Sequence, residues 1–179
     1  MRRQTDDRPH TNQDDESRPL RLRCPAVEPG ARRTRGRFNW PRHNPFLGTI
    51  GPDGRPHVAG FGAAWLDGDL YFTSNLASRK ARNLAANPAC TIAVKMAGID
   101  LTLAGTALRV SDAATLERIA AIYRNGGWPA EVAGDALTAP FSAPSAGPPP
   151  WHLFRFTFDT VVGVATVEPF GATRWQFAR

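Results

Sequence analysis

The chain has 179 residues, of which 42% are hydrophobic and 21% are charged, which is ordinary for a soluble globular domain with a short tail. No apolar run approaches the ~18 residues that a membrane helix needs, and no apolar signal segment follows the N-terminal Met. We therefore expect a cytoplasmic protein with no membrane partner.

The net charge of +6 suggests nucleic-acid binding at first sight, but most of the excess lies in residues 1–37. That segment holds ten Arg against six Asp or Glu, and mixed signs weaken any field that would attract a polyanion. It is also poor in aromatic residues, so it buries too little apolar surface to offset the entropy of ordering. The sequence predicts a disordered tail over 1–37, a domain over 38–179 and no nucleic-acid partner. A basic nucleic-acid-binding module is the alternative.

The two cysteines, Cys24 and Cys90, are too few for a disulfide framework, and no Cys or His cluster has metal-ligand spacing. Cys90 lies in an apolar, strand-like run and is interpreted as a buried small hydrophobe. The sequence therefore predicts no metal site.

Short apolar runs separated by turn signals predict strands in the first half of the domain. Turns at 51–54 and 67–68 join them as hairpins. The expected strands cover residues 46–50, 55–65 and 70–74.

A helix is predicted from Ser78 to Asn87. Ser78 is a favoured N-cap residue, whose hydroxyl can accept a backbone N–H of the first turn. Leu84 and Ala85 repeat on the face of Ala81, and Pro88 ends the helix because it cannot continue one.

Two long strands over 90–95 and 99–110 come next, with Gly105 expected as a bulge or bend. Ser111-Asp112 caps a second helix, which ends at Gly126-Gly127. The Pro- and Ala-rich stretch over 125–150 is interpreted as a long loop, either a lid or an ordinary or disordered surface insertion. The remaining expected elements are a strand over 151–158, a turn at Asp159-Thr160, and strands over 161–167 and 171–177.

Strands outnumber helices, and hairpins join most neighbouring strands, so the sheet should be mainly antiparallel. One curled sheet with two or more short helices indicates a small, Greek-key-like barrel. The fold class is therefore mainly β.

The charge at the start of the first helix is unusual. Arg79 and Lys80 occupy its first turn, where the helix dipole is already positive, so cations are unfavourable there unless an anion is supplied. Backbone N–H groups, the Ser78 hydroxyl, a guanidinium and an ammonium at one point suit a phosphate. The alternative is that Arg79, Lys80 and Arg82 form a solvated helix face.

Five segments over about residues 43–177 together resemble the pyridoxamine 5′-phosphate oxidase-like split-barrel family, in its actinobacterial type. The family uses FMN or the deazaflavin coenzyme F-420. The segments are Gly54-Arg-Pro-His57, Tyr71-Phe-Thr-Ser74, Ser78-Arg-Lys80 with Asn83-Leu84, Gly105-Thr-Ala107, and Ala172-Thr-Arg-Trp-Gln-Phe177.

The resemblance implies a split β-barrel homodimer, in which the second subunit completes the cofactor cleft. It also implies hydride transfer between FMN or F-420 and a small organic substrate. A non-catalytic flavin- or deazaflavin-binding carrier or sensor is the alternative. No side chain is a convincing general acid, so no catalytic residue is assigned.

The resemblance places the cofactor phosphate at Arg79 and Lys80, the isoalloxazine ring against the strand with Phe72-Thr73, and Asp100 near the flavin of the partner subunit. On physical grounds, Thr73 and Ser74 could supply small polar groups at the ring edge. Arg55 and His57 could reach the phosphate or the ring edge, and Trp175 could stack on the cofactor. The alternatives are a strand end for Thr73 and Ser74, a solvated turn for Arg55 and plain core for Trp175. The expected cofactor-binding residues are Arg55, His57, Phe72, Thr73, Ser74, Ser78, Arg79, Lys80, Asp100 and Trp175.

Two departures from the family pattern argue against a vitamin B6 substrate. The chain ends Thr173-Arg-Trp-Gln-Phe177, without the Arg-x-His-Asp-Arg type motif that grips the substrate phosphate in the true oxidases. A family Lys on the second strand falls near Gly62, so it is also missing.

Overall fold

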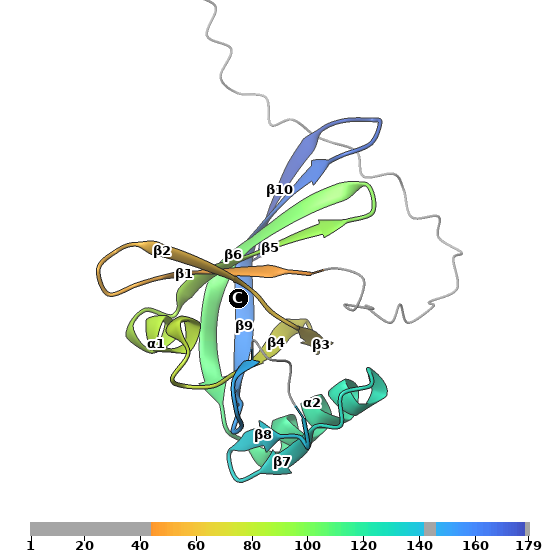
Figure 1. The fold of residues 1–179 in the computed structure, drawn as a ribbon. Coiled ribbons are helices and arrows are strands. Elements are labelled where there is room, and N and C mark those ends of the chain that lie inside the picture. The colour runs from red at the N-terminus through yellow and green to blue at the C-terminus, as the bar shows by residue number, and fades with distance from the viewer. Residues whose placement is uncertain (1–43, 142–145, 178–179) are drawn as a thin grey trace, which may run out of the picture.

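The computed structural model describes residues 44–141 and 146–177, so the tail predicted over 1–37 and Cys24 lie outside the described residues. The described part is a curled sheet with two helices, shown in Figure 1. The elements are β1 (Phe46–Ile50), β2 (Pro56–Gly60), β3 (Ala64–Leu66), β4 (Asp69–Ser74), α1 (Arg79–Ala86), β5 (Ala89–Met96), β6 (Ile99–Val110), α2 (Ala113–Asn125), β7 (Glu131–Ala133), β8 (Ala136–Thr138), β9 (His152–Ala165) and β10 (Ala172–Gln176).

The main sheet is antiparallel and has the strand order β2-β1-β5-β6-β9-β4-β3. The first half of β9 pairs with β4 and its second half pairs with β10, so β9 joins two parts of the sheet. The edge strands β2 and β3 are joined by residues 61–63 but do not pair with each other, so the barrel stays open along that line. The predicted mainly-β split barrel is therefore confirmed.

A β-bulge lies where β6 crosses β9. The register shifts between Ala104 and Gly105, which pair with Thr160 and Phe158 and leave Asp159 without an opposite residue. A Cβ on Gly105 would lie 2.1 Å from the Thr157 carbonyl oxygen, so only glycine fits. The bulge predicted at Gly105 is confirmed. The turn predicted at Asp159-Thr160 is wrong, because β9 absorbs the irregularity as a bulge and continues.

The barrel interior is packed by alternate residues of the strands. Phe72 is completely buried there, stacked on Phe154 with ring centroids 5.3 Å apart. Cys90 belongs to the same cluster, and burial raises the pKa of its thiol to about 12. Its predicted role as a buried small hydrophobe is confirmed. A second apolar cluster joins the outside of β4 and β9 to α2 and to the β7–β8 hairpin.

Two expected boundaries differ in the structure. The strand predicted over 55–65 is two strands, because Phe61 turns inward and packs edge-to-face on Phe72, with ring centroids 5.2 Å apart. The long loop expected over 125–150 contains the β7–β8 hairpin, in which Leu137 is buried and pairs with Trp151. The pairing of the buried Leu137 with Trp151 therefore orders part of this Pro-rich stretch.

No helix in the described part of the chain is long and apolar enough to cross a membrane. Residues 44–141 and 146–177 also contain no group of three or more His, Cys, Asp or Glu side chains that could hold a metal ion.

Candidate functional site

Helix α1 begins as the sequence predicts. Ser78 is the N-cap, and its hydroxyl accepts a hydrogen bond from the Ala81 N–H at 3.2 Å. The first N–H groups of a helix have no intrahelical acceptor, so those of Arg79 and Lys80 remain available at this end. The first turn contains no acidic residue. The start of α1 therefore combines backbone donors and two cations.

The end of β4 fixes where α1 starts. The buried Ser74 hydroxyl lies 2.7 Å from the Ser78 hydroxyl, so the last residue of the strand contacts the cap of the helix. The Asn75 side chain accepts from the Ala77 N–H at 2.8 Å, which stabilises the turn between them. These short-range bonds hold Ser74 and Ser78 together, as the expected site requires.

A second set of bonds ties α1 to the β1–β2 hairpin. The buried Asn83 amide donates to the Thr49 hydroxyl at 3.0 Å, and that hydroxyl donates to the His57 carbonyl oxygen at 3.4 Å. Asn83, rather than the expected Ala85, shares the buried face with Ala81 and Leu84. This link holds α1 against β1, which pairs with the His57 segment of β2, as seen where α1 lies beside β1 in Figure 1.

The electrostatics of this cluster are those of an anion site. Burial, and then the positive charges of Arg79 and Lys80, lower the pKa of His57. Burial also lowers the pKa of Lys80. Within 44–141 and 146–177, no carboxylate forms an ion pair with Arg79 or Lys80. Three basic side chains therefore meet without a compensating negative charge.

The His57 ring adds a further sign of a missing partner. Its Nδ1 atom is buried and has no hydrogen-bond partner within the described ranges. A phosphate at the start of α1 would supply both an acceptor for such a group and the missing negative charge. The residues present thus fit the phosphate of a flavin or deazaflavin cofactor, and the cofactor itself would supply the hydride chemistry.

Three other expected site residues lie near this cluster but differ in access. Arg55 is exposed in the β1–β2 turn, with its Nε 3.8 Å from an Asp53 carboxylate oxygen. Thr73 is half-buried on the opposite face of β4 from Ser74, beside Tyr123. Phe72 is enclosed in the core, so its side chain cannot reach a cofactor at the surface of this chain. For this strand, backbone groups are what a flavin could contact.

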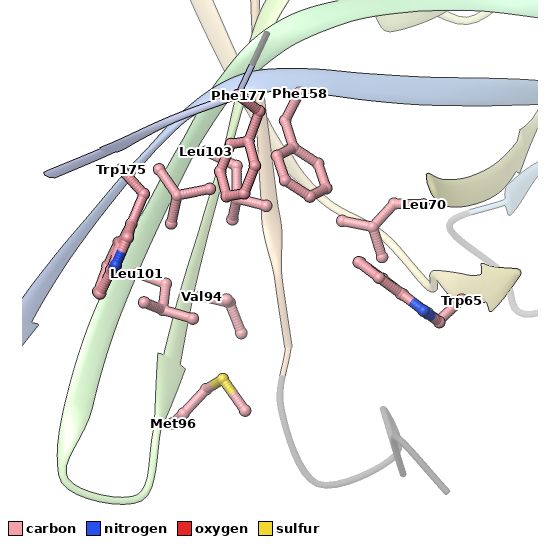
Figure 2. Close-up of a pocket in the computed structure, with 10 residues that line it drawn as sticks. Trp65, Leu70, Val94, Met96, Leu101, Leu103, Phe158, Trp175 and Phe177 are labelled. Atoms are coloured by element: carbon pink, nitrogen blue, oxygen red, sulfur yellow. The ribbon is translucent and has the colours of Figure 1, made fainter. Parts of the chain in front are cut away.

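Asp100 and Trp175 lie away from the start of α1. Asp100 is exposed near the tip of the β5–β6 hairpin, opposite Lys95. Trp175 of β10 lines an apolar hollow of about 350 Å³, together with Trp65, Phe158 and Phe177 (Figure 2). The structure therefore does not join either residue to the His57, Arg79 and Lys80 cluster within one chain. Their roles toward a cofactor stay predictions.

A second polar group was missed by the sequence reasoning. Arg109 of β6 forms an ion pair with Asp135 of the β7–β8 turn, and His152 Nε2 lies 3.7 Å from the same carboxylate. Burial, followed by the charge of Arg109, lowers the pKa of His152. His152 is the cross-strand neighbour of Ser74. No local motif joins these residues, because the fold brings them together from three separate elements.

The open antiparallel barrel defines the class of split-barrel proteins. The sequence model of the pyridoxamine 5′-phosphate oxidase family matches residues 38–165. The chain belongs to this family. None of the curated proteins matches it.

Solved structures show the same fold at low identity. A pyridoxamine 5′-phosphate oxidase-related, FMN-binding protein from Nostoc punctiforme is 18% identical, with a TM-score of 0.51 over 78% of this chain and 88% of that one. HupZ from Group A Streptococcus is 13% identical, with a TM-score of 0.51 over 72% and 90%. An F420 reductase is 23% identical, with a TM-score of 0.46 over 66% and 87%.

Proposed function

We propose that the protein is an oxidoreductase that binds FMN or the deazaflavin coenzyme F-420 and passes a hydride between it and a small organic substrate. The observation that carries the proposal is the start of α1, where Ser78, Arg79, Lys80 and His57 converge and, within residues 44–141 and 146–177, no carboxylate pairs with the two cations. Membership of the pyridoxamine 5′-phosphate oxidase family supports a flavin-type cofactor.

In this proposal the chain binds and orients, and the cofactor carries the redox chemistry. Arg79 and Lys80 hold the phosphate, with backbone N–H groups of the first helical turn beside them. The Ser74–Ser78 contact keeps the end of β4 next to that phosphate, so the ring can lie along β4. Positioning of the two reactants then accounts for the rate enhancement, since oriented reactants need little further assistance.

We also propose a homodimer, because two adjoining cross-strand rows on the outer face of the sheet are uncharged across β1, β5, β6 and β9. One cross-strand row holds Phe46, Ala93, Thr102 and Val162 and ends at Arg174 of β10, and the next holds Val58, Gly48, Thr91, Ala104 and Thr160. Phe46 and Val58 are exposed by half or more. Apolar area of this kind on a sheet face suits a second copy of the chain, which would complete the cofactor cleft.

Separate titrations of FMN and F-420 test the proposal. The full chain should bind at least one of them tightly, and the reduced cofactor should turn over steadily with an organic acceptor. Binding without turnover across a panel of acceptors would instead support a carrier or sensor. Failure to bind either cofactor would contradict both readings.

A further inference from the structure

We infer that His57 makes the anion site sensitive to charge: His57 takes up a proton when a dianion docks at α1, so the site prefers doubly charged over singly charged oxyanions. This inference rests on the proposed function, since it concerns the same phosphate site. The proton passes from solvent to the imidazole, and no other bond changes.

The geometry places His57 where it would meet such an anion. It lies on the inward-facing side of β2, and its backbone is held by Thr49, which Asn83 of α1 fixes in turn. Its Nδ1 atom is buried without a partner in the part of the chain that the structure describes. The hydrogen bonds from Asn83 to Thr49 and from Thr49 to His57 set the distance between β2 and α1. His57 therefore cannot move away from the charges of α1 without breaking these hydrogen bonds.

The charged groups around His57 favour a neutral imidazole while the site holds no anion. Burial, and then the positive charges of Arg79 and Lys80 on α1, lower the pKa of His57 below its usual value. Thr49 of β1 is neutral, and Arg55 and Asp53 at the hairpin turn interact with each other. Protonated His57 would be a third positive charge beside two, and the described residues offer no paired carboxylate to offset it.

An anion changes this balance in proportion to its charge. A dianion offsets both Arg79 and Lys80, so an imidazolium then meets no net repulsion, whereas a monoanion leaves one positive charge uncompensated. The pKa of His57 should therefore rise more with a dianion bound. Binding becomes tighter as pH falls, by about tenfold for each unit by which the pKa rises.

The preference bears on the choice of cofactor. FMN carries a phosphomonoester, whose charge approaches −2 at neutral pH. The phosphate of F-420 is a diester with a single negative charge. We expect the site to favour a terminal phosphomonoester such as that of FMN at pH values above the second pKa of that group, about 6, where it carries two charges.

Sulfate and methyl sulfate test the inference, because they differ in charge and neither titrates between about pH 5 and pH 8, unlike a phosphomonoester. In the full chain, the NMR signals of the His57 ring, assigned with the H57Q variant, would be followed against pH with no oxyanion, with sulfate and with methyl sulfate. Sulfate should raise the pKa of His57 by about half a unit or more, and methyl sulfate by less. Sulfate affinity should fall with rising pH in the wild type and stay flat in His57→Gln. His152→Gln is the matched control and should keep the wild-type slope.

The outcomes separate this inference from the proposed function. If sulfate and FMN bind but the pKa of His57 does not move and the pH slope survives in His57→Gln, the inference is wrong and the phosphate site stands. If F-420 binds but sulfate and FMN do not, the inference is wrong and the phosphate site stands, and if none of the three binds at any pH, the phosphate site and the inference are both wrong.

Discussion

At the residue scale, the buried Thr49–Asn83 pair determines where the start of α1 lies. Both side chains are almost fully buried, and each is the other's hydrogen-bond partner. Thr49→Val removes the hydroxyl and leaves the Asn83 amide without its acceptor, which should lower the free energy of unfolding by about 1–3 kcal/mol. Urea unfolding of the full chain measures this loss.

A double variant provides the control. Thr49→Val with Asn83→Leu removes both polar groups, so it should cost less than the sum of the two single changes. Strictly additive losses would show that the two side chains do not act as a pair.

Local sequence signals predicted part of the site. Ser78, Arg79 and Lys80 are adjacent in the chain, so capping preference and helix-dipole reasoning suffice to place them together. Asn83 and Thr49 are 34 residues apart and meet only because α1 crosses to β1. The Arg109, Asp135 and His152 group depends in the same way on the complete fold. Hydrophobic period and turn chemistry carry no information about such distant pairs.

At the element scale, the β6–β9 crossing should be the position least tolerant of added volume. Gly105→Ala would place a methyl group against the Thr157 backbone, and strands paired on both sides cannot shift easily. We expect a loss of roughly 2 kcal/mol or more in the free energy of unfolding. Gly62→Ala is the matched control, since nothing lies within 4 Å of the added carbon and it should change little.

Thermal and urea unfolding of both alanine variants check this prediction. A Gly105→Ala protein as stable as Gly62→Ala would mean that the bulge accepts a side chain, contrary to the close approach described above.

Most elements follow from sequence pattern, and the exceptions have specific causes. The apolar, strand-like run of β5 and the capping of both helices made their positions predictable. The bulge at Asp159 looked like a turn, because Asp-Thr after an aromatic run is also a turn signal. The β7–β8 hairpin was missed because its strands have three residues each and are anchored by distant partners such as Trp151.

At the scale of the whole molecule, the uncharged sheet face predicts a dimer at micromolar concentration. Ala93→Asp places a charge in the middle of that face at an exposed position, so the dimer should dissociate while the monomer stays folded. Val167→Asp, at an exposed site beyond β9, should remain dimeric. Sedimentation analysis with a melting curve for each variant makes the comparison. A wild-type monomer that binds cofactor with full affinity would contradict the shared cleft.

The central claim, that a cofactor phosphate docks at Arg79 and Lys80, is tested most directly by comparing ligands with and without that phosphate. FMN and riboflavin share one ring, as do F-420 and its phosphate-free deazaflavin. Each charge-assisted contact is worth roughly 1.5–3 kcal/mol, so Arg79→Ala with Lys80→Ala should weaken binding of the phosphorylated ligand by about 10² to 10⁴-fold. Binding of the phosphate-free ligand should change little.

Fluorescence titrations at constant salt on three proteins complete the measurement: wild type, the Arg79→Ala/Lys80→Ala variant, and an Arg118→Ala/Arg155→Ala control with the same loss of charge near α2. The affinity gap between FMN and riboflavin, or between the two deazaflavins, should disappear only in the Arg79→Ala/Lys80→Ala variant. If the wild type binds a phosphorylated cofactor and the Arg79/Lys80 variant binds it within about threefold as well, the start of α1 is a solvated helix face and the assigned site is wrong.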